Sequence, residues 1–222
     1  MNTFYPELIS KNKYKEHEIN KQENLFIKGY YAPDDVLDPL IEWCRTLPLI
    51  GGASQSTQTG EISVWDGKMN AHKECYEHGI FWPTINEPSV LTFLDWCQFA
   101  LEHYMDEYTM LREGGKFKMD PDFNYQKYPK GHAYNGWHCE RGSIESTHRM
   151  LVWMMYLNEC EDGGETSFLF QKYNMKPERG LLLFWPSDFT HTHRGMPSYK
   201  TEKEIVTGWY SYCSKGDNLQ WI

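Results

Sequence analysis

A histidine and a carboxylate stand two positions apart in the segment Trp137-His138-Cys139-Glu140. On an extended strand the side chains at i and i+2 share a face, so His138 and Glu140 can reach one metal ion. In a chain with nine histidines this pairing is a weak signal, and an ordinary packed or exposed His–Glu pair is the commoner explanation. The same parity directs Cys139 to the opposite face, where we interpret it as a packing residue.

A third ligand has to come from another segment, and FTHTHRGMP offers two candidates. His191 and His193 are again two positions apart, so we expect them to share a face of a strand. Two histidines and one carboxylate form the facial triad of non-haem Fe(II) sites, which leaves coordination positions open for small molecules. Strand geometry alone does not choose between His191 and His193.

The order of the motifs that follow Glu140 is much more specific. In chain order they are Arg149, Tyr156-Leu157-Asn158, Gly163-Gly164-Glu165-Thr166-x-Phe168, His193-Arg194-Gly195-x-Pro197 and Lys203. With this order, residues 121–213 resemble the catalytic domain of the prolyl 4-hydroxylase branch of the 2-oxoglutarate/Fe(II) dioxygenases. The resemblance implies a double-stranded β-helix (jelly roll) and an enzyme that hydroxylates a C–H bond with Fe(II), 2-oxoglutarate and O2. It also implies ascorbate as a candidate reductant.

The resemblance implies that His138, Glu140 and His193 hold the iron. The H-x-G-x-P context and the spacing to Lys203 select His193 over His191. Glu140 is a departure, because most members of the family have Asp at this position. Lys203 matches the basic residue that pairs with the distal carboxylate of 2-oxoglutarate, which an ammonium group binds by a charge-assisted hydrogen bond.

Three further residues have weaker assignments. Tyr128 and Tyr156 match tyrosines that hydrogen-bond the same 2-oxoglutarate carboxylate, although a buried tyrosine with an internal partner is an equal alternative. Arg149 matches an arginine near the peptide substrate in some prolyl hydroxylases. Residues 50–85, with Trp65 and Trp82, are interpreted as loops and short strands, and they are a candidate for a flap that covers the substrate.

The substrate is the least determined feature. Family analogy favours a prolyl residue in a peptide or protein, and analogy is weak warrant for a substrate. A free amino acid or another small molecule is the alternative for an enzyme. A non-catalytic jelly-roll module that binds a metal or ligand is the alternative of another class.

The elements that must position these residues change character along the chain. Asn24–Tyr31 alternates like a strand, and helical spacing of apolar residues predicts helices near 33–44 and 88–108. Residues 121–213 hold short aromatic or β-branched runs separated by turn residues. We therefore expect one domain over residues 1–222, mostly β with N-terminal helices (α+β). Helical support and loops would occupy about 1–110, with a β-helix core over about 121–213.

The composition excludes several classes of protein. The net charge of −9 disfavours nucleic-acid binding, which depends on cationic side chains. The sequence contains no run of about 18 apolar residues, so we expect no membrane helix. It also has no apolar segment near the N-terminus, so we expect no signal peptide. The six cysteines form no C-x-x-C pair, which fits a reduced, cytoplasmic protein. The sequence makes no prediction of oligomeric state.

Overall fold

The computed structural model describes residues 15–17, 25–51, 53–55, 62–64 and 73–213. Within these ranges the strands form an eight-stranded sheet, a three-stranded sheet and a two-stranded ribbon, and all of their strand pairs are antiparallel. The large sheet has the order β1 (Lys15–His17), β2 (Lys28–Tyr31), β11 (Leu181–Pro186), β8 (Arg149–Tyr156), β13 (Lys203–Tyr212), β7 (Phe117–Tyr128), β6 (Tyr76–Phe81), β3 (Ile50–Gly51). The small sheet has the order β10 (Tyr173–Met175), β9 (Thr166–Phe168), β12 (His193–Gly195), and the ribbon pairs β4 (Ala53–Gln55) with β5 (Ile62–Val64).

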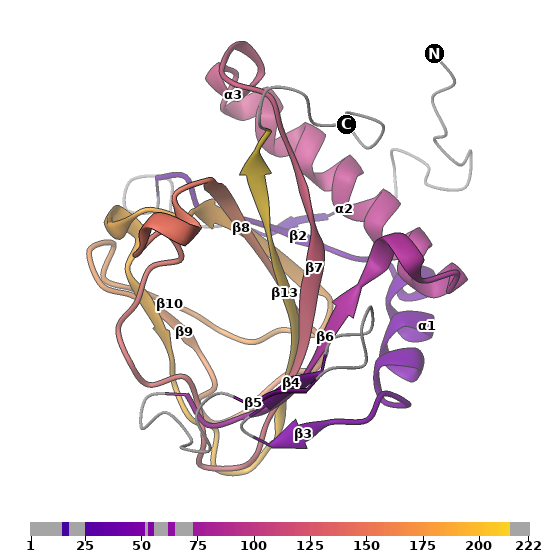
Figure 1. Ribbon diagram of the computed structural model, residues 1–222. Helices are drawn as coiled ribbons and strands as arrows, with labels where there is room; N and C mark the ends of the chain where they lie inside the picture. Colours follow the sequence, from indigo (N-terminus) through magenta and orange to yellow (C-terminus); the bar gives the residue numbers. More distant parts are fainter. Residues whose placement is uncertain (1–14, 18–24, 52, 56–61, 65–72, 214–222) are drawn as a thin grey trace.

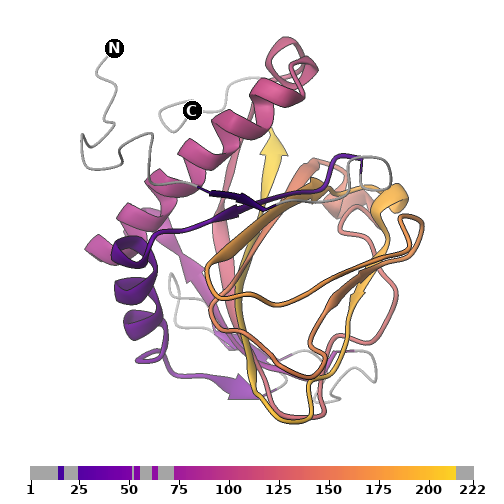
Figure 2. The ribbon, with the colours of Figure 1, turned by 180° about the vertical axis from the view of Figure 1, so that it is seen from behind.

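Helices cover one side of the large sheet, and the small sheet lies across its other side (Figures 1 and 2). The α-helices are α1 (Asp34–Cys44), α2 (Pro88–Glu107) and the short α3 (Met110–Glu113). Short 3-10 turns occur at η1 (Trp82–Thr84), η2 (Ile144–Ser146) and η3 (Phe189–His191). This arrangement confirms a mostly β chain and is consistent with the jelly roll that the sequence predicts.

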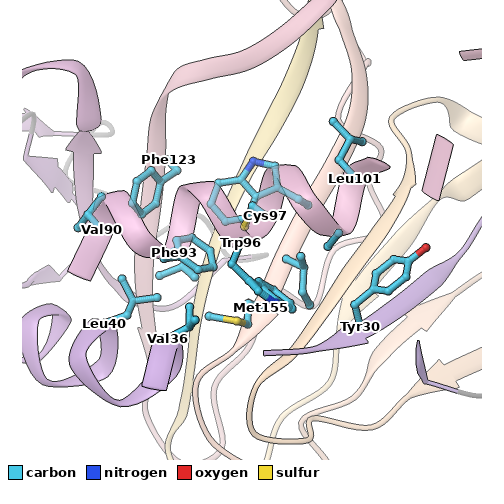
Figure 3. Close-up of a cluster of buried hydrophobic side chains, with 14 of the residues drawn as sticks. Tyr30, Val36, Leu40, Val90, Phe93, Trp96, Cys97, Leu101, Phe123 and Met155 are labelled. Atoms are coloured by element: carbon cyan, nitrogen blue, oxygen red, sulfur yellow. The ribbon is translucent and has the colours of Figure 1, made fainter. Parts of the chain in front are cut away.

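The central strands are buried on both faces, which explains why their sequences read as continuous apolar runs. In β8, Leu151, Trp153 and Met155 pack in the core between the sheet and the helices. Val152, Met154 and Tyr156 point the other way, into the core between the two sheets. Figure 3 shows the helix-side core, in which side chains of α1 and α2 meet those of the sheet.

Both predicted helices are present, at Asp34–Cys44 and Pro88–Glu107. The first predicted strand is shorter than expected, because β2 begins only at Lys28. Its expected start, Asn24, lies outside the described residues. Phe26 has a φ of 67°, which is incompatible with an extended strand. Two tyrosine hydroxyls hold the turn: Tyr104 donates to the Phe26 carbonyl at 2.8 Å, and Tyr108 accepts from the Phe26 amide at 3.1 Å.

The short strands predicted within residues 50–85 are confirmed as β3, β4, β5 and β6, but the C-terminal part of the segment belongs to the large sheet and not to a flap. Tyr76–Phe81 forms β6, which pairs with β7 inside the large sheet. Trp82 is buried in the helix-side core, and its indole N–H donates to the Asp120 carbonyl at 2.8 Å. Cross-strand pairing and burial therefore override the loop-like composition. Trp65 lies outside the described residues. Among the residues described, no helix combines the length and the apolar character that crossing a bilayer requires.

Candidate metal centre

Three side chains from two segments of the chain converge on one point: His138 and Glu140 come from one segment, and His193 comes from the other. One ligand atom from each of His138, Glu140 and His193 lies within 4.8 Å of the others. Oε1 of Glu140 is 3.4 Å from Nε2 of His138 and 3.6 Å from Nε2 of His193. The two histidines form an isolated antiparallel bridge, with His193 N–H donating to the His138 carbonyl at 2.8 Å and the reciprocal bond at 3.0 Å.

The backbone fixes the tautomer of both histidines. Nδ1 of His138 donates to the Gly136 carbonyl at 2.8 Å, and Nδ1 of His193 donates to the His191 carbonyl at 2.9 Å. Because the proton sits on Nδ1, each Nε2 carries a lone pair directed at the same point. Burial, followed by the charge of His138, lowers the pKa of His193 to about 4, so this imidazole is neutral at pH 7.

The two carboxylate oxygens of Glu140 have different surroundings. Oε1 faces the histidines, whereas Oε2 accepts the indole N–H of Trp209 at 3.0 Å and lies 3.4 Å from Nη1 of Arg149. Burial by itself raises the pKa of Glu140. Its interactions with His138, His193 and Arg149 outweigh burial and lower the pKa of Glu140 to about 2. Two imidazoles that present Nε2 and one ionised carboxylate are donors that Fe(II) binds, so the donor set fits this metal.

Aromatic side chains surround the imidazoles. Tyr134 stacks on His138 with ring centroids 3.8 Å apart. Trp185 contacts His193 edge-on at 5.1 Å, and the ring centroid of Phe168 is 5.8 Å from that of His193. These rings hold the imidazoles in place and keep bulk water away from that side of the site.

A cavity of about 640 Å³ connects the triad with Lys203. Lys203 is 5% exposed, and its Nζ donates to the Gly164 carbonyl at 3.0 Å. Burial lowers the pKa of Lys203 to about 8. Among the described residues no carboxylate forms an ion pair with this ammonium group, and its Nζ lies over the rings of Tyr128 and Tyr156. A cation buried in this way is suited to receive an anionic ligand.

The two tyrosines differ in their access to the cavity. Tyr128 lines it, and its hydroxyl donates to Oε1 of Gln126 at 2.7 Å. Tyr156 is fully buried and is not among the lining residues; its hydroxyl is 2.6 Å from Oγ1 of Thr166. Both hydroxyls therefore have internal partners, and their role toward a bound carboxylate stays a prediction.

The expected shared face of His191 and His193 is wrong. His191 ends the 3-10 turn η3, and β12 begins only at His193, so the segment is not one continuous strand. Nε2 of His191 lies 3.1 Å from the Leu25 carbonyl, and the residue lines a different, largely apolar cavity of about 740 Å³. Cys139 also differs from expectation, because it is partly exposed and lines the cavity of the triad.

A polar cluster in the same cavity was not predicted from the sequence. Glu77, a buried residue of β6, accepts from Lys73 Nζ at 2.6 Å and from Gln126 Nε2 at 3.1 Å. Trp209 also lines this cavity, and its indole N–H donates to Glu140. Strand alternation in β6 and β13 could have placed both side chains on the inner face, but only if those strands had been aligned with their neighbours.

Residues 123–211 match the family model described as the 2OG-Fe(II) oxygenase superfamily. This matched range includes the triad and Lys203. Among curated proteins, none matches the chain.

Solved structures with the same fold include several prolyl hydroxylases. A viral collagen prolyl hydroxylase from Paramecium bursaria Chlorella virus-1, in complex with 2-oxoglutarate, has a TM-score of 0.61 at 17% identity, over 87% of this chain and 100% of its own. A Pseudomonas putida prolyl-4-hydroxylase has a TM-score of 0.60 at 18% identity, over 91% and 94%. A prolyl hydroxylase from Trichoplax adhaerens, in complex with a peptide fragment of the hypoxia inducible factor oxygen degradation domain, has a TM-score of 0.57 at 15% identity, over 91% and 84%. At these identities the similarity shows a shared fold.

Proposed function

Since residues 123–211 match the family model of the 2OG-Fe(II) oxygenase superfamily, we propose that this protein hydroxylates a C–H bond of a prolyl residue in a peptide or protein. The observation that carries the oxygenase function is one cavity that holds both a His-Glu-His triad and the buried cation Lys203. A structural metal site would need the three ligands but has no use for an ammonium group at the far end of the same cavity.

Each residue has a defined task in this proposal. His138 and His193 bind Fe(II) through Nε2, and Glu140 binds it through Oε1. Lys203 holds the distal carboxylate of 2-oxoglutarate, with Tyr128 and Tyr156 near its ammonium group. When bound, Fe(II) with 2-oxoglutarate and O2 supplies the oxidising power for the hydroxylation, and 2-oxoglutarate leaves as succinate and CO2. Tyr134, Phe168 and Trp185 exclude water from the histidine side.

The prolyl substrate is supported by the fold that the chain shares with three prolyl hydroxylases. The cavity also favours a second candidate, a polar small molecule such as a free amino acid. The cluster of Lys73, Glu77 and Gln126 presents both charges in the same cavity, and such groups orient small polar ligands. The substrate contact expected of Arg149 stays a prediction.

A substrate screen that measures succinate tests the proposal. The protein is incubated with Fe(II), 2-oxoglutarate and O2, with and without ascorbate, and with proline-containing peptides or free amino acids. We expect peptides to stimulate succinate formation above the uncoupled rate and to gain one oxygen atom on a prolyl residue. Stimulation by amino acids alone would replace the prolyl substrate by the small-molecule candidate.

The non-catalytic alternative is tested without turnover. Anaerobic addition of Fe(II) and 2-oxoglutarate should give a weak visible charge-transfer band in the wild type, and His138→Ala should abolish that band. If the wild type develops no band, the chain is a binding module and the oxygenase proposal fails.

A further inference from the structure

A carboxylate in a metal site can present one or both of its oxygens, and the longer side chain of glutamate adds a torsion that must also be fixed. We propose that Trp209 and Arg149 act as positioning residues that clamp Oε2 of Glu140, so that Oε1 alone faces the metal. This inference rests on the proposed function, because it takes the triad as the set of metal ligands.

The first support is that the two oxygens of Glu140 contact different groups. Oε2 lies 3.0 Å from Nε1 of Trp209, and the indole N–H can only donate. Nη1 of Arg149 lies 3.4 Å from the same oxygen. Turning the carboxylate so that both oxygens face the histidines would break the contact with Trp209 and leave a partly buried N–H without its partner, which is unfavourable.

The second support is the rigidity of the clamp. The guanidinium of Arg149 stacks on the indole of Trp209, with Cζ 3.6 Å from the ring centroid. Arg149 begins β8 and Trp209 lies in the adjacent strand β13, which pairs with β8 along its length. Nε of Arg149 is buried without a hydrogen-bond partner among the described residues. Its position therefore depends on the stack and on Glu140, whose backbone carbonyl lies 3.4 Å from Nη1.

The clamp has a consequence for coordination. A carboxylate that donates through one oxygen occupies one position, so three positions of an octahedral ion stay open. Fixing the long side chain before the metal arrives also removes the loss of conformational entropy from the binding step. Both effects predict tighter metal binding and a defined coordination geometry when the clamp is intact.

Co(II) titration of the full chain tests the clamp, with affinity from calorimetry and geometry from the visible spectrum, and with neither 2-oxoglutarate nor substrate present. Trp209→Phe keeps a ring in place and removes the N–H that holds Oε2. We expect Co(II) affinity to fall by about 10- to 100-fold, the usual effect of losing a partner of a metal ligand, and the spectrum to change. Trp43→Phe is the matched control, because Trp43 packs in α1 on the helix-side core. It should bind Co(II) as the wild type does.

Glu140→Asp separates positioning from a general structural role. The shorter carboxylate no longer reaches the indole, so Trp209→Phe should change Co(II) affinity less than about threefold in the Glu140→Asp background, as a double-mutant cycle measures. Thermal unfolding of the metal-free variants verifies that each one is folded. An equal loss of affinity in both backgrounds, or wild-type affinity and spectrum in Trp209→Phe, overturns the clamp. Failure of the wild type to bind Co(II) overturns the proposed function itself and the clamp with it.

Discussion

At the scale of single residues, the candidate site depends on which atom of each side chain is already committed. Nδ1 of His138 and Nδ1 of His193 each donate a hydrogen bond to a backbone carbonyl, so the Nε2 atoms remain available to a metal. The indole N–H of Trp209 donates to Oε2 of Glu140, so Oε1 remains available to a metal. Hydrogen bonds to the non-ligating atoms therefore orient all three donors before a metal binds.

The two neighbouring histidines give a sharp test of the ligand assignment. His193→Ala should weaken Co(II) binding by more than about 100-fold, because loss of an outer partner alone is worth about 10- to 100-fold. His191→Ala should change it less than about threefold, since the carbonyl that receives the His193 proton belongs to the backbone and survives the substitution. Calorimetric titration measures both, and comparable losses in the two variants would contradict the assignment.

Lys203 should make 2-oxoglutarate binding sensitive to pH. Its pKa of about 8 means that the ammonium is charged below pH 8 and loses its charge above it. The affinity of the Co(II)-loaded protein for 2-oxoglutarate should therefore fall as pH rises from 8 to about 9. Lys203→Arg keeps its charge over this range, so its affinity should be independent of pH there. Lys203→Met should bind about 10- to 100-fold more weakly, as expected for a lost charge-assisted hydrogen bond. A wild-type profile that rises with pH would exclude this role.

At the scale of elements, the site is assembled from strand ends and loops that the large sheet supports. β13 contributes Lys203 and Trp209, β8 begins at Arg149 and β12 begins at His193. Gly208, next to Trp209, keeps β13 close to β8, because a Cβ at this position would lie 2.6 Å from Cζ2 of the buried Trp153. The register of β13 against β7 shifts between Gly208 and Tyr210, whereas against β8 the pairing stays regular over these residues and Trp209 lies opposite Val152.

Gly208→Ala should consequently destabilise the fold. Overpacking a filled core costs about 1–3 kcal/mol, which for a chain of this size lowers the Tm by roughly 2–4 °C per kcal/mol. Gly142→Ala is the control, because its new Cβ would meet only the Cys139 carbonyl at an ordinary 3.7 Å. Differential scanning calorimetry compares the two, and an unchanged Tm for Gly208→Ala would mean that Trp153 has room to move.

At the scale of the whole molecule, the cavity lies between two sheets, so a bound metal and cosubstrate would bridge them. Ligands that bind only the folded state stabilise it by about 2.7 kcal/mol at a concentration of 100 Kd. Co(II) together with 2-oxoglutarate should then raise the Tm by roughly 5–10 °C. A His138→Ala/His193→Ala variant should show little of this shift, and an equal shift in that variant would place the binding elsewhere.

The sequence by itself determined the local features. Helical periodicity located α1 and α2, and the buried residues of both helices fall at the predicted spacing. The ordered motifs located His138, His193 and Lys203, because such motifs carry both the type of residue and its spacing. The alternation of buried side chains in β8 follows from the same kind of local signal.

Only the tertiary structure decided which side chains meet. His191 and His193 are equivalent by strand parity, and they separate because η3 ends where β12 begins, so that the two imidazoles enter different cavities. The contact of Trp209 with Glu140 joins residues that are distant in the sequence, and no local pattern encodes it. Periodicity reports the face on which a residue lies, whereas the register between strands and the packing of the two sheets fix its partner.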